Sequence, residues 1–234
     1  MTVADQPRCE MTLPDQFAET RQSLHALAEH VLCAARYQAI GRIGLTVVDG
    51  GFATPPFGDD DCTVGVEGTD LVVRAGGQER RAPITTLRAA GELAGVAPGA
   101  PSNLFKPTTP CDLDAPLPVD ADAAEQLAGW YALGDEALRR LTLEIADDQP
   151  SDVTLWPEHF DVGIRAGEVN YGASPGDAPV PEPYLYVAPT GLDLGATGDS
   201  FWNQPFGATL TWEAIGSVED ALDFFRQGRQ HAAG

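Results

Sequence analysis

The sequence predicts an α+β fold: a largely antiparallel β-sheet built from two strand clusters, with helices packed on one side. Two observations lead to this prediction. Apolar residues recur at helical spacing near the N-terminus, in the middle and near the C-terminus, and short strand-like runs lie between them. Several of these runs are joined by connections of hairpin length, which can link antiparallel neighbours but not parallel ones.

The first half reads as a helix followed by an antiparallel meander. Pro14 and Asp15 are favoured in a first helical turn, and an apolar stripe extends the predicted helix to about Tyr37, before Gly41. Strand-like runs follow as I-G-L-T-V-V, C-T-V-G-V, L-V-V-R and Q-E-R-R-A-P-I. A short helix is expected over residues 85–93.

Residues 95–118 form a long stretch rich in Pro, Gly and Ala. Loops of this length are uncommon inside a compact domain, which favours a joint between subdomains. We therefore expect a single α+β domain over residues 12–234, in which this joint connects subdomains over 12–94 and 119–234. Residues 1–11 are predicted to be a flexible tail.

The second half has the same order of helix and strands, although no repeat of fixed period occurs. Asp120 is expected to cap a long helix. Strands are predicted at T-L-W-P-E-H-F-D-V-G-I-R, P-Y-L-Y-V and A-T-L-T-W-E-A. The sequence S-V-E-D at 217–220 matches a capping box and predicts the start of a final helix.

The chain is strongly acidic. It carries 35 acidic against 14 basic residues, a net charge of −21, and Lys106 is the only lysine. Such a charge repels phosphates and anionic lipids, so neither nucleic acid nor a membrane is an expected partner. Solubility alone explains the acidity, and a basic protein partner or a cationic ligand is the functional alternative.

We expect a soluble bacterial protein in the cytoplasm. The N-terminus lacks a basic, apolar leader, and no apolar run reaches membrane-spanning length. Arginine in place of lysine, with abundant Ala, Gly, Asp and Pro, suits a GC-rich bacterial coding bias.

The cysteines are expected to be free thiols. Cys9, Cys33, Cys62 and Cys111 are widely spaced without a C-x-x-C motif, and a chain of this size needs no disulfide. Cys62 follows three aspartates, whose charges would raise its pKa, the wrong direction for a nucleophile.

No metal or cofactor is assigned from the sequence. The aspartates at 59–61 lack the spacing of a calcium loop. The pattern H-x-x-x-E-H at 25–30 differs from the zinc motif H-E-x-x-H, so His25 and His30 are predicted to be surface or interface residues.

The candidate site lies between Thr154 and Pro189, where aromatic and ionisable residues are densest. Because alternate side chains of a strand point to opposite faces, parity assigns Trp156 and Phe160 to a buried face. The opposite face collects polar and aromatic residues from the neighbouring strands: His159, Asp161, Tyr184, Tyr186, Thr209, Thr211 and Glu213. This face is either the wall of a pocket or a solvated sheet surface.

If the face is a pocket, His159 and Asp161 are the predicted catalytic residues, because a carboxylate can orient an imidazole. The predicted ligand-binding residues are Trp156, Tyr171, Tyr184, Tyr186, Trp202, Thr211 and Glu213. The sequence S-P-G-D at 174–177 favours a tight turn over a phosphate-binding or nucleophile loop.

The run L-W-P-E-H-F-D, the S-P-G-D loop and the strand P-E-P-Y-L-Y together resemble an uncharacterised, largely bacterial family of domains of unknown function. Members of that family pair a W-P-x-H-F-D strand with an S-P-G-D loop. The resemblance implies no activity, but it marks the matching positions as site candidates: Trp156, Pro157, His159, Phe160, Asp161, Ser174, Pro175, Gly176 and Asp177.

Three functions stay open at this point. The first is binding of a small ligand on the second-half sheet face, with aromatic walls. The second is an enzyme, a hydrolase or isomerase, with His159 as general base oriented by Asp161. The third is an acidic scaffold that binds a protein partner or forms a homo-oligomer.

Overall fold

The structure is a computed structural model that describes residues 13–191, 193–194 and 199–233. The predicted tail over residues 1–11 lies outside these ranges. No helix within them is both long and apolar enough to cross a membrane.

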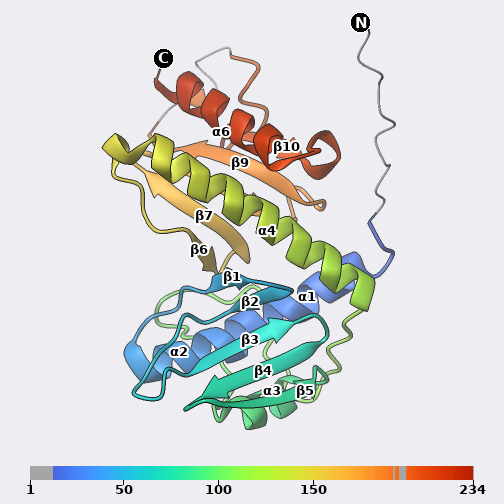
Figure 1. Cartoon of the computed structure of the whole chain (residues 1–234). Helices are drawn as coiled ribbons and strands as arrows, with labels where there is room; N and C mark the ends of the chain where they lie inside the picture. The colour runs from blue at the N-terminus through green and yellow to red at the C-terminus, as the bar shows by residue number, and fades with distance from the viewer. Residues whose placement is uncertain (1–12, 192, 195–198, 234) are drawn as a thin grey trace, which may run out of the picture.

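The first half contains one long helix, a five-stranded antiparallel sheet and a short helix (Figure 1). The two helices and the antiparallel meander are as predicted, but β2 (Gly51–Ala53) is not among the predicted strands. The long helix is α1 (Phe17–Leu27), a π-helical turn η1 (Ala28–Leu32) and α2 (Cys33–Ile40), which ends at Gly41 with φ 70°. The remaining elements are β1 (Thr46–Val48), β2 (Gly51–Ala53), β3 (Thr63–Glu67), β4 (Asp70–Ala75), β5 (Gln78–Pro83) and α3 (Leu87–Ala94).

The second half has the same order of elements. Its long helix is α4 (Ala121–Glu144), capped by Asp120, whose Oδ1 accepts a 3.0 Å bond from the amide of Ala123. The sheet and the following elements are η2 (Ala146–Asp148), β6 (Thr154–Trp156), β7 (Asp161–Ala166), β8 (Val169–Ser174), β9 (Tyr184–Pro189), β10 (Ala208–Thr211), η3 (Trp212–Ala214) and α6 (Val218–Ala233). Ser217 Oγ accepts from the amide of Asp220, as the predicted helix start requires.

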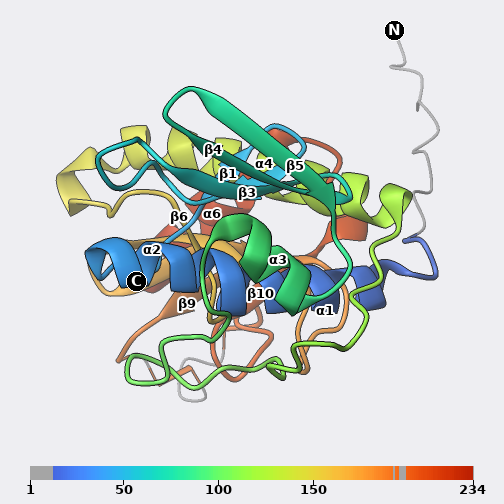
Figure 2. The same cartoon turned by 90° about the horizontal axis from the view of Figure 1, so that it is seen from below.

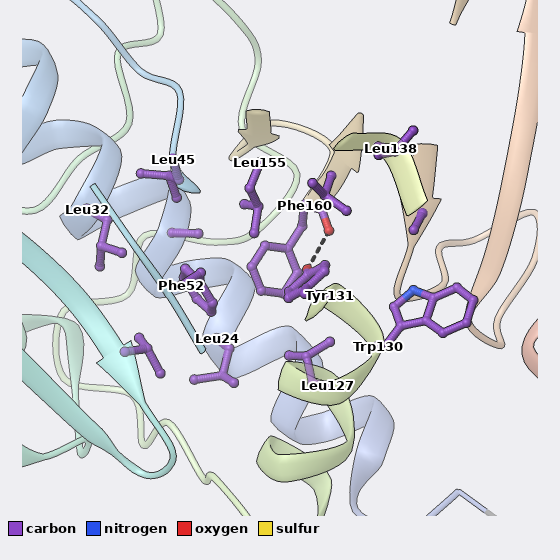
Figure 3. Close-up of a cluster of buried hydrophobic side chains, with 14 of the residues drawn as sticks. Leu24, Leu32, Leu45, Phe52, Leu127, Trp130, Tyr131, Leu138, Leu155 and Phe160 are labelled. Atoms are coloured by element: carbon purple, nitrogen blue, oxygen red, sulfur yellow. Dashed lines mark hydrogen bonds between the residues drawn. The ribbon is translucent and has the colours of Figure 1, made fainter. Parts of the chain in front are cut away.

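The two sheets are joined at one point. Leu45, just before β1, and Leu155 in β6 exchange two backbone hydrogen bonds of 2.8 and 3.0 Å. Helix α4 contacts strands of both sheets, so one continuous apolar core spans the two halves (Figure 3).

Aromatic rings fill the centre of this core. Phe160 lies between Phe52 of β2 and Tyr131 of α4, with edge-to-face ring centroids 5.3 and 5.6 Å apart. The Tyr131 hydroxyl donates a 2.6 Å bond to the carbonyl of Phe160 (Figure 3). The three rings thus join the two halves of the chain, and the buried hydroxyl of Tyr131 has a hydrogen-bond partner.

Each sheet has helices on one face. Helix α4 crosses in front of the second sheet, whereas α1 and α2 run behind the first (Figure 1). Helix α6 packs beside α4 over β9. The face of the second sheet that α4 and α6 leave uncovered is the one that the sequence analysis singles out.

Candidate functional site

An open cleft of about 800 Å³ lies against this uncovered face of the second sheet; we call it the junction cleft. One wall comes from α1 and from Thr108 and Thr109, in the segment before α4. The other wall comes from the second half. Its lining residues are Glu158, His159, Asp161, Ser174, Gly176, Asp177, Ala178, Pro179, Tyr184, Tyr186, Ala188 and Phe206.

Helix α1 holds the S-P-G-D loop. The Nη1 atom of Arg21 donates hydrogen bonds of 3.1 and 2.8 Å to the carbonyls of Pro175 and Pro181. Gly176 has φ 99°, and a Cβ atom there would overlap both Arg21 and the Pro181 carbonyl. Glycine is therefore required for the loop to close around the guanidinium.

The S-P-G-D sequence begins the connection from β8 to β9: Ser174 is the last residue of β8, and the chain bends at Pro175. Ser174 Oγ accepts a 3.2 Å bond from the amide of Gly176. Asp177 accepts a 2.9 Å bond from the amide of Val180 through Oδ1, and a 2.8 Å bond from the Tyr184 hydroxyl through Oδ2. These groups shape the rim of the junction cleft.

Helix α1 also holds the turn that follows β6. His25 Nε2 lies 2.9 Å from the carbonyl of Pro157, and the imidazole stacks on the ring of Phe160 with centroids 4.8 Å apart. Burial lowers the pKa of His25, against the opposing effect of Glu29. Because the carbonyl needs a donor, Nε2 carries the proton in the neutral ring.

The π-helical turn anchors the segment rich in proline. Glu29 is fully buried and accepts bonds of 2.9 and 2.8 Å from the amides of Thr108 and Thr109, with a further bond from the Thr109 hydroxyl. His30 accepts from the amide of Ala100 through Nδ1, so its Nε2 donates to the carbonyl of Thr109. The segment over 95–118 is thus bonded to the long helix and runs beside α1 in Figure 2, and its residues Thr108 and Thr109 form part of the cleft wall.

Tyr186 lies flat on the sheet. In the register of the strands, Gly172 of β8 lies between Gly163 of β7 and Tyr186 of β9. A Cβ atom at residue 172 would come within 2.5 Å of the tyrosine ring, so the ring covers the space that glycine leaves. Its hydroxyl donates a 2.5 Å bond to Oδ2 of Asp161.

Asp161 is the buried ionisable group of the cleft. The residue is only 7% exposed, and its Oδ1 atom has no hydrogen-bond partner within the described part of the chain. Burial raises the pKa of the carboxyl, and the hydrogen bond from Tyr186 opposes this effect. Burial also raises the pKa values of Tyr184 and Tyr186.

The structure brings four of the predicted catalytic and ligand-binding residues into the cleft, His159, Asp161, Tyr184 and Tyr186. Ser174, Gly176 and Asp177, which the resemblance marked as candidates, line it too. The other predicted ligand-binding residues, Trp156, Tyr171, Trp202, Thr211 and Glu213, do not line it. Tyr171 is 1% exposed and packs on Phe225 of α6, on the opposite face of the sheet. Trp202 lies against Phe201, near the end of α6.

The parity assignment of Trp156 to the buried face is wrong. Residues 157–160 form a turn, and Phe160 has φ 55°, so the chain reverses between β6 and β7. Trp156 is consequently the direct cross-strand partner of Asp161 and is 38% exposed, whereas Phe160 is buried as expected. His159 lies in the turn, and among the described residues the Asp161 carboxylate accepts from Tyr186 and not from the His159 imidazole.

The sequence analysis missed the contribution of α1. Arg21, His25 and Glu29 follow one another at steps of four and so share one face of the helix, and this polar line was the available signal. His30 is not a surface residue, as it is only 2% exposed, and the imidazoles of His25 and His30 both bond backbone carbonyls of later segments of the same chain. Gln22, Thr108, Thr109 and Phe206 gave no comparable signal.

Within the described ranges, no group of three or more His, Cys, Asp or Glu residues could hold a metal ion. Comparisons of the chain with protein-family models, curated proteins and solved structures found no match. The resemblance to the W-P-x-H-F-D family therefore stays a prediction.

Proposed function

We propose that the protein binds a small organic ligand in the junction cleft. The observation that carries this proposal is the cleft itself, with its volume of about 800 Å³ and its mixture of aromatic and polar walls. Ligand sites typically measure roughly 300–1,000 Å³ and combine apolar walls with a few convergent polar groups. Tyr184 and Tyr186 supply the apolar walls, and Arg21, Glu158 and Asp161 supply the polar groups.

The preformed walls support the same proposal. Arg21, His25 and Glu29 fix the S-P-G-D loop, the 157–160 turn and the Thr108–Thr109 wall through hydrogen bonds to backbone groups. Walls that are already ordered lose little conformational entropy when a ligand binds, which favours affinity.

The test is a metabolite panel screened by thermal shift, with isothermal titration calorimetry on every hit. Ala188 lines the cleft, and the Ala188→Trp variant is expected to abolish binding by filling it. Ala132→Trp, at an exposed position of α4, adds the same side chain elsewhere and should bind like the wild type. Equal binding by both variants, or no hit across the panel, would refute the proposal.

A second candidate function is catalysis with His159 as general base. The observation that favours it is that His159 and Asp161 line the same cleft, where a positive charge on the imidazole would attract the carboxylate. The test is hydrolysis of chromogenic ester, phosphate and glycoside substrates. Loss of turnover in a folded His159→Ala variant would support it, and unchanged turnover would count against it.

A further inference from the structure

We infer that the ligand of the junction cleft carries an organic cation, an ammonium or amidinium group, which pairs with the carboxylates of Asp161 and Glu158. This inference rests on the proposed function and adds the chemical class of the ligand.

Two buried carboxylate oxygens at the cleft have no hydrogen-bond partner among the described residues: Oδ1 of Asp161 and Oε2 of Glu158. Both residues line the cleft. A buried carboxylate without a donor or a positive charge is unfavourable, so native proteins pair such groups. Among the described residues no group donates to these oxygens, and a ligand in the adjoining cleft can supply a donor.

The charge of the lining also favours a cation. It contains the three carboxylates of Glu158, Asp161 and Asp177 against the single guanidinium of Arg21. Nη1 of that guanidinium is bonded to two carbonyls of the S-P-G-D loop region. With a net charge of −21 on the whole chain, the long-range field attracts cations and repels anions.

The tyrosines provide a surface that suits an organic cation. One face of the Tyr186 ring covers Gly172, and Tyr186 also lines the cleft, so its other face is directed away from the sheet. The ring of Tyr184 lies beside it, with centroids 6.3 Å apart. A cation over such rings is attracted by their electron density, and a nearby carboxylate strengthens the site.

The site is expected to respond to pH through Asp161. The ionisable groups that face it are Tyr184 and Tyr186 from β9, Tyr131 from α4, and Glu158 and His159 from the turn. A cation pairs with the ionised carboxylate, so its affinity should fall as the pH falls and Asp161 takes up a proton.

The experiment compares cations with neutral compounds of the same shape. Calorimetry would measure binding of benzylamine against benzyl alcohol, benzamidine against benzamide, and choline against 3,3-dimethylbutan-1-ol. Calcium chloride and magnesium chloride serve as inorganic controls. At least one cation is expected to bind about tenfold or more tightly than its neutral partner.

Asp161→Asn removes the charge but keeps an acceptor for the Tyr186 hydroxyl. It should reduce the ratio of cation affinity to neutral-partner affinity to about one. Glu158→Gln should lower the same ratio. Glu125→Gln removes one exposed charge from α4 and should change nothing. Should Asp161→Asn misfold, Glu158→Gln and the pH dependence of the wild type decide the question.

Equal binding of cations and neutral partners, binding of the metal ions alone, or binding of none of these probes would each overturn the inference. Detection by native mass spectrometry of a neutral or anionic metabolite, displaced by Ala188→Trp, would overturn it too while leaving the proposed function intact. If no compound of the metabolite panel binds, both the proposed function and the inference of a cationic ligand would be refuted.

Discussion

The guanidinium of Arg21 occupies the space that a Cβ atom at residue 176 would need. The two residues come from opposite halves of the chain, and the loop that contains Gly176 closes around the arginine through the carbonyls of Pro175 and Pro181. One wall of the junction cleft therefore depends on a glycine in its middle and an arginine on a distant helix.

We expect Gly176→Ala to lower the free energy of unfolding by about 2–4 kcal/mol, because backbone strain at φ 99° adds to the overlap with Arg21. Urea denaturation would measure the change. Gly129→Ala is the matched control, since Gly129 lies in α4 with no atom near its Cβ position. That change should be neutral or stabilising by about 0.5–1 kcal/mol, and equal losses in both variants would contradict the assigned role of Gly176.

Asp161→Asn should change how stability depends on pH. Burial raises the pKa of Asp161 above its ordinary value of 3.8, so the folded state holds the proton more tightly than the unfolded state. Its contribution to stability is fully present below pH 3.8 and is lost as the pH rises through the folded pKa. As the pH rises from 3.8 through the folded pKa, the free energy of unfolding of Asp161→Asn should increase relative to that of the wild type, by at most about 1.4 kcal/mol per pH unit.

Urea unfolding at a series of pH values would measure this difference. Asp114→Asn gives a control of opposite sign, because the hydrogen bond from Arg88 lowers the pKa of Asp114. Its contribution is present above the unfolded pKa and is lost as the pH falls. A stability difference between wild type and Asp161→Asn that stays flat with pH would contradict the assignment.

Glu29→Ala should release the wall formed by Thr108 and Thr109. The substitution leaves the amides of Thr108 and Thr109 without their acceptor, and we expect a loss of about 2–4 kcal/mol in the free energy of unfolding. The rate of hydrogen exchange should increase more at the amides of Thr108 and Thr109 than at the amides of the second sheet. Glu92→Ala, an exposed change in α3, is the control and should leave the exchange unaltered.

Cys33 should be unreactive in the folded protein. It is fully buried, and burial raises the pKa of its thiol to about 12. The exposed Cys111 should therefore react with iodoacetamide at pH 8 long before Cys33, which reacts only after unfolding. Peptide mass spectrometry would give the order, and early labelling of Cys33 would refute it.

The elements of the fold were readable from local patterns. The helix that ends at Gly41, the cap at Asp120 and the antiparallel arrangement of the strands depend on residues close together in the chain, and the structure confirms them. The sequence did not predict strands β2 and β8, and it predicted one strand where the structure has β6 and β7. The register around the site was less accessible, because the left-handed residue Phe160 reverses the chain and shifts the parity of Trp156. Parity is valid only while a strand continues.

The sequence by itself determined the two antiparallel clusters and the region that contains His159, Asp161, Tyr184 and Tyr186, because side-chain periodicity and residue composition are local properties. Only the tertiary structure decided that this region faces α1 across a cleft. The bond from Arg21 to the Pro175 carbonyl spans 154 residues of sequence, and no local pattern encodes a pairing at that separation. Packing of the shared core around Phe52, Tyr131 and Phe160 brings those distant segments together.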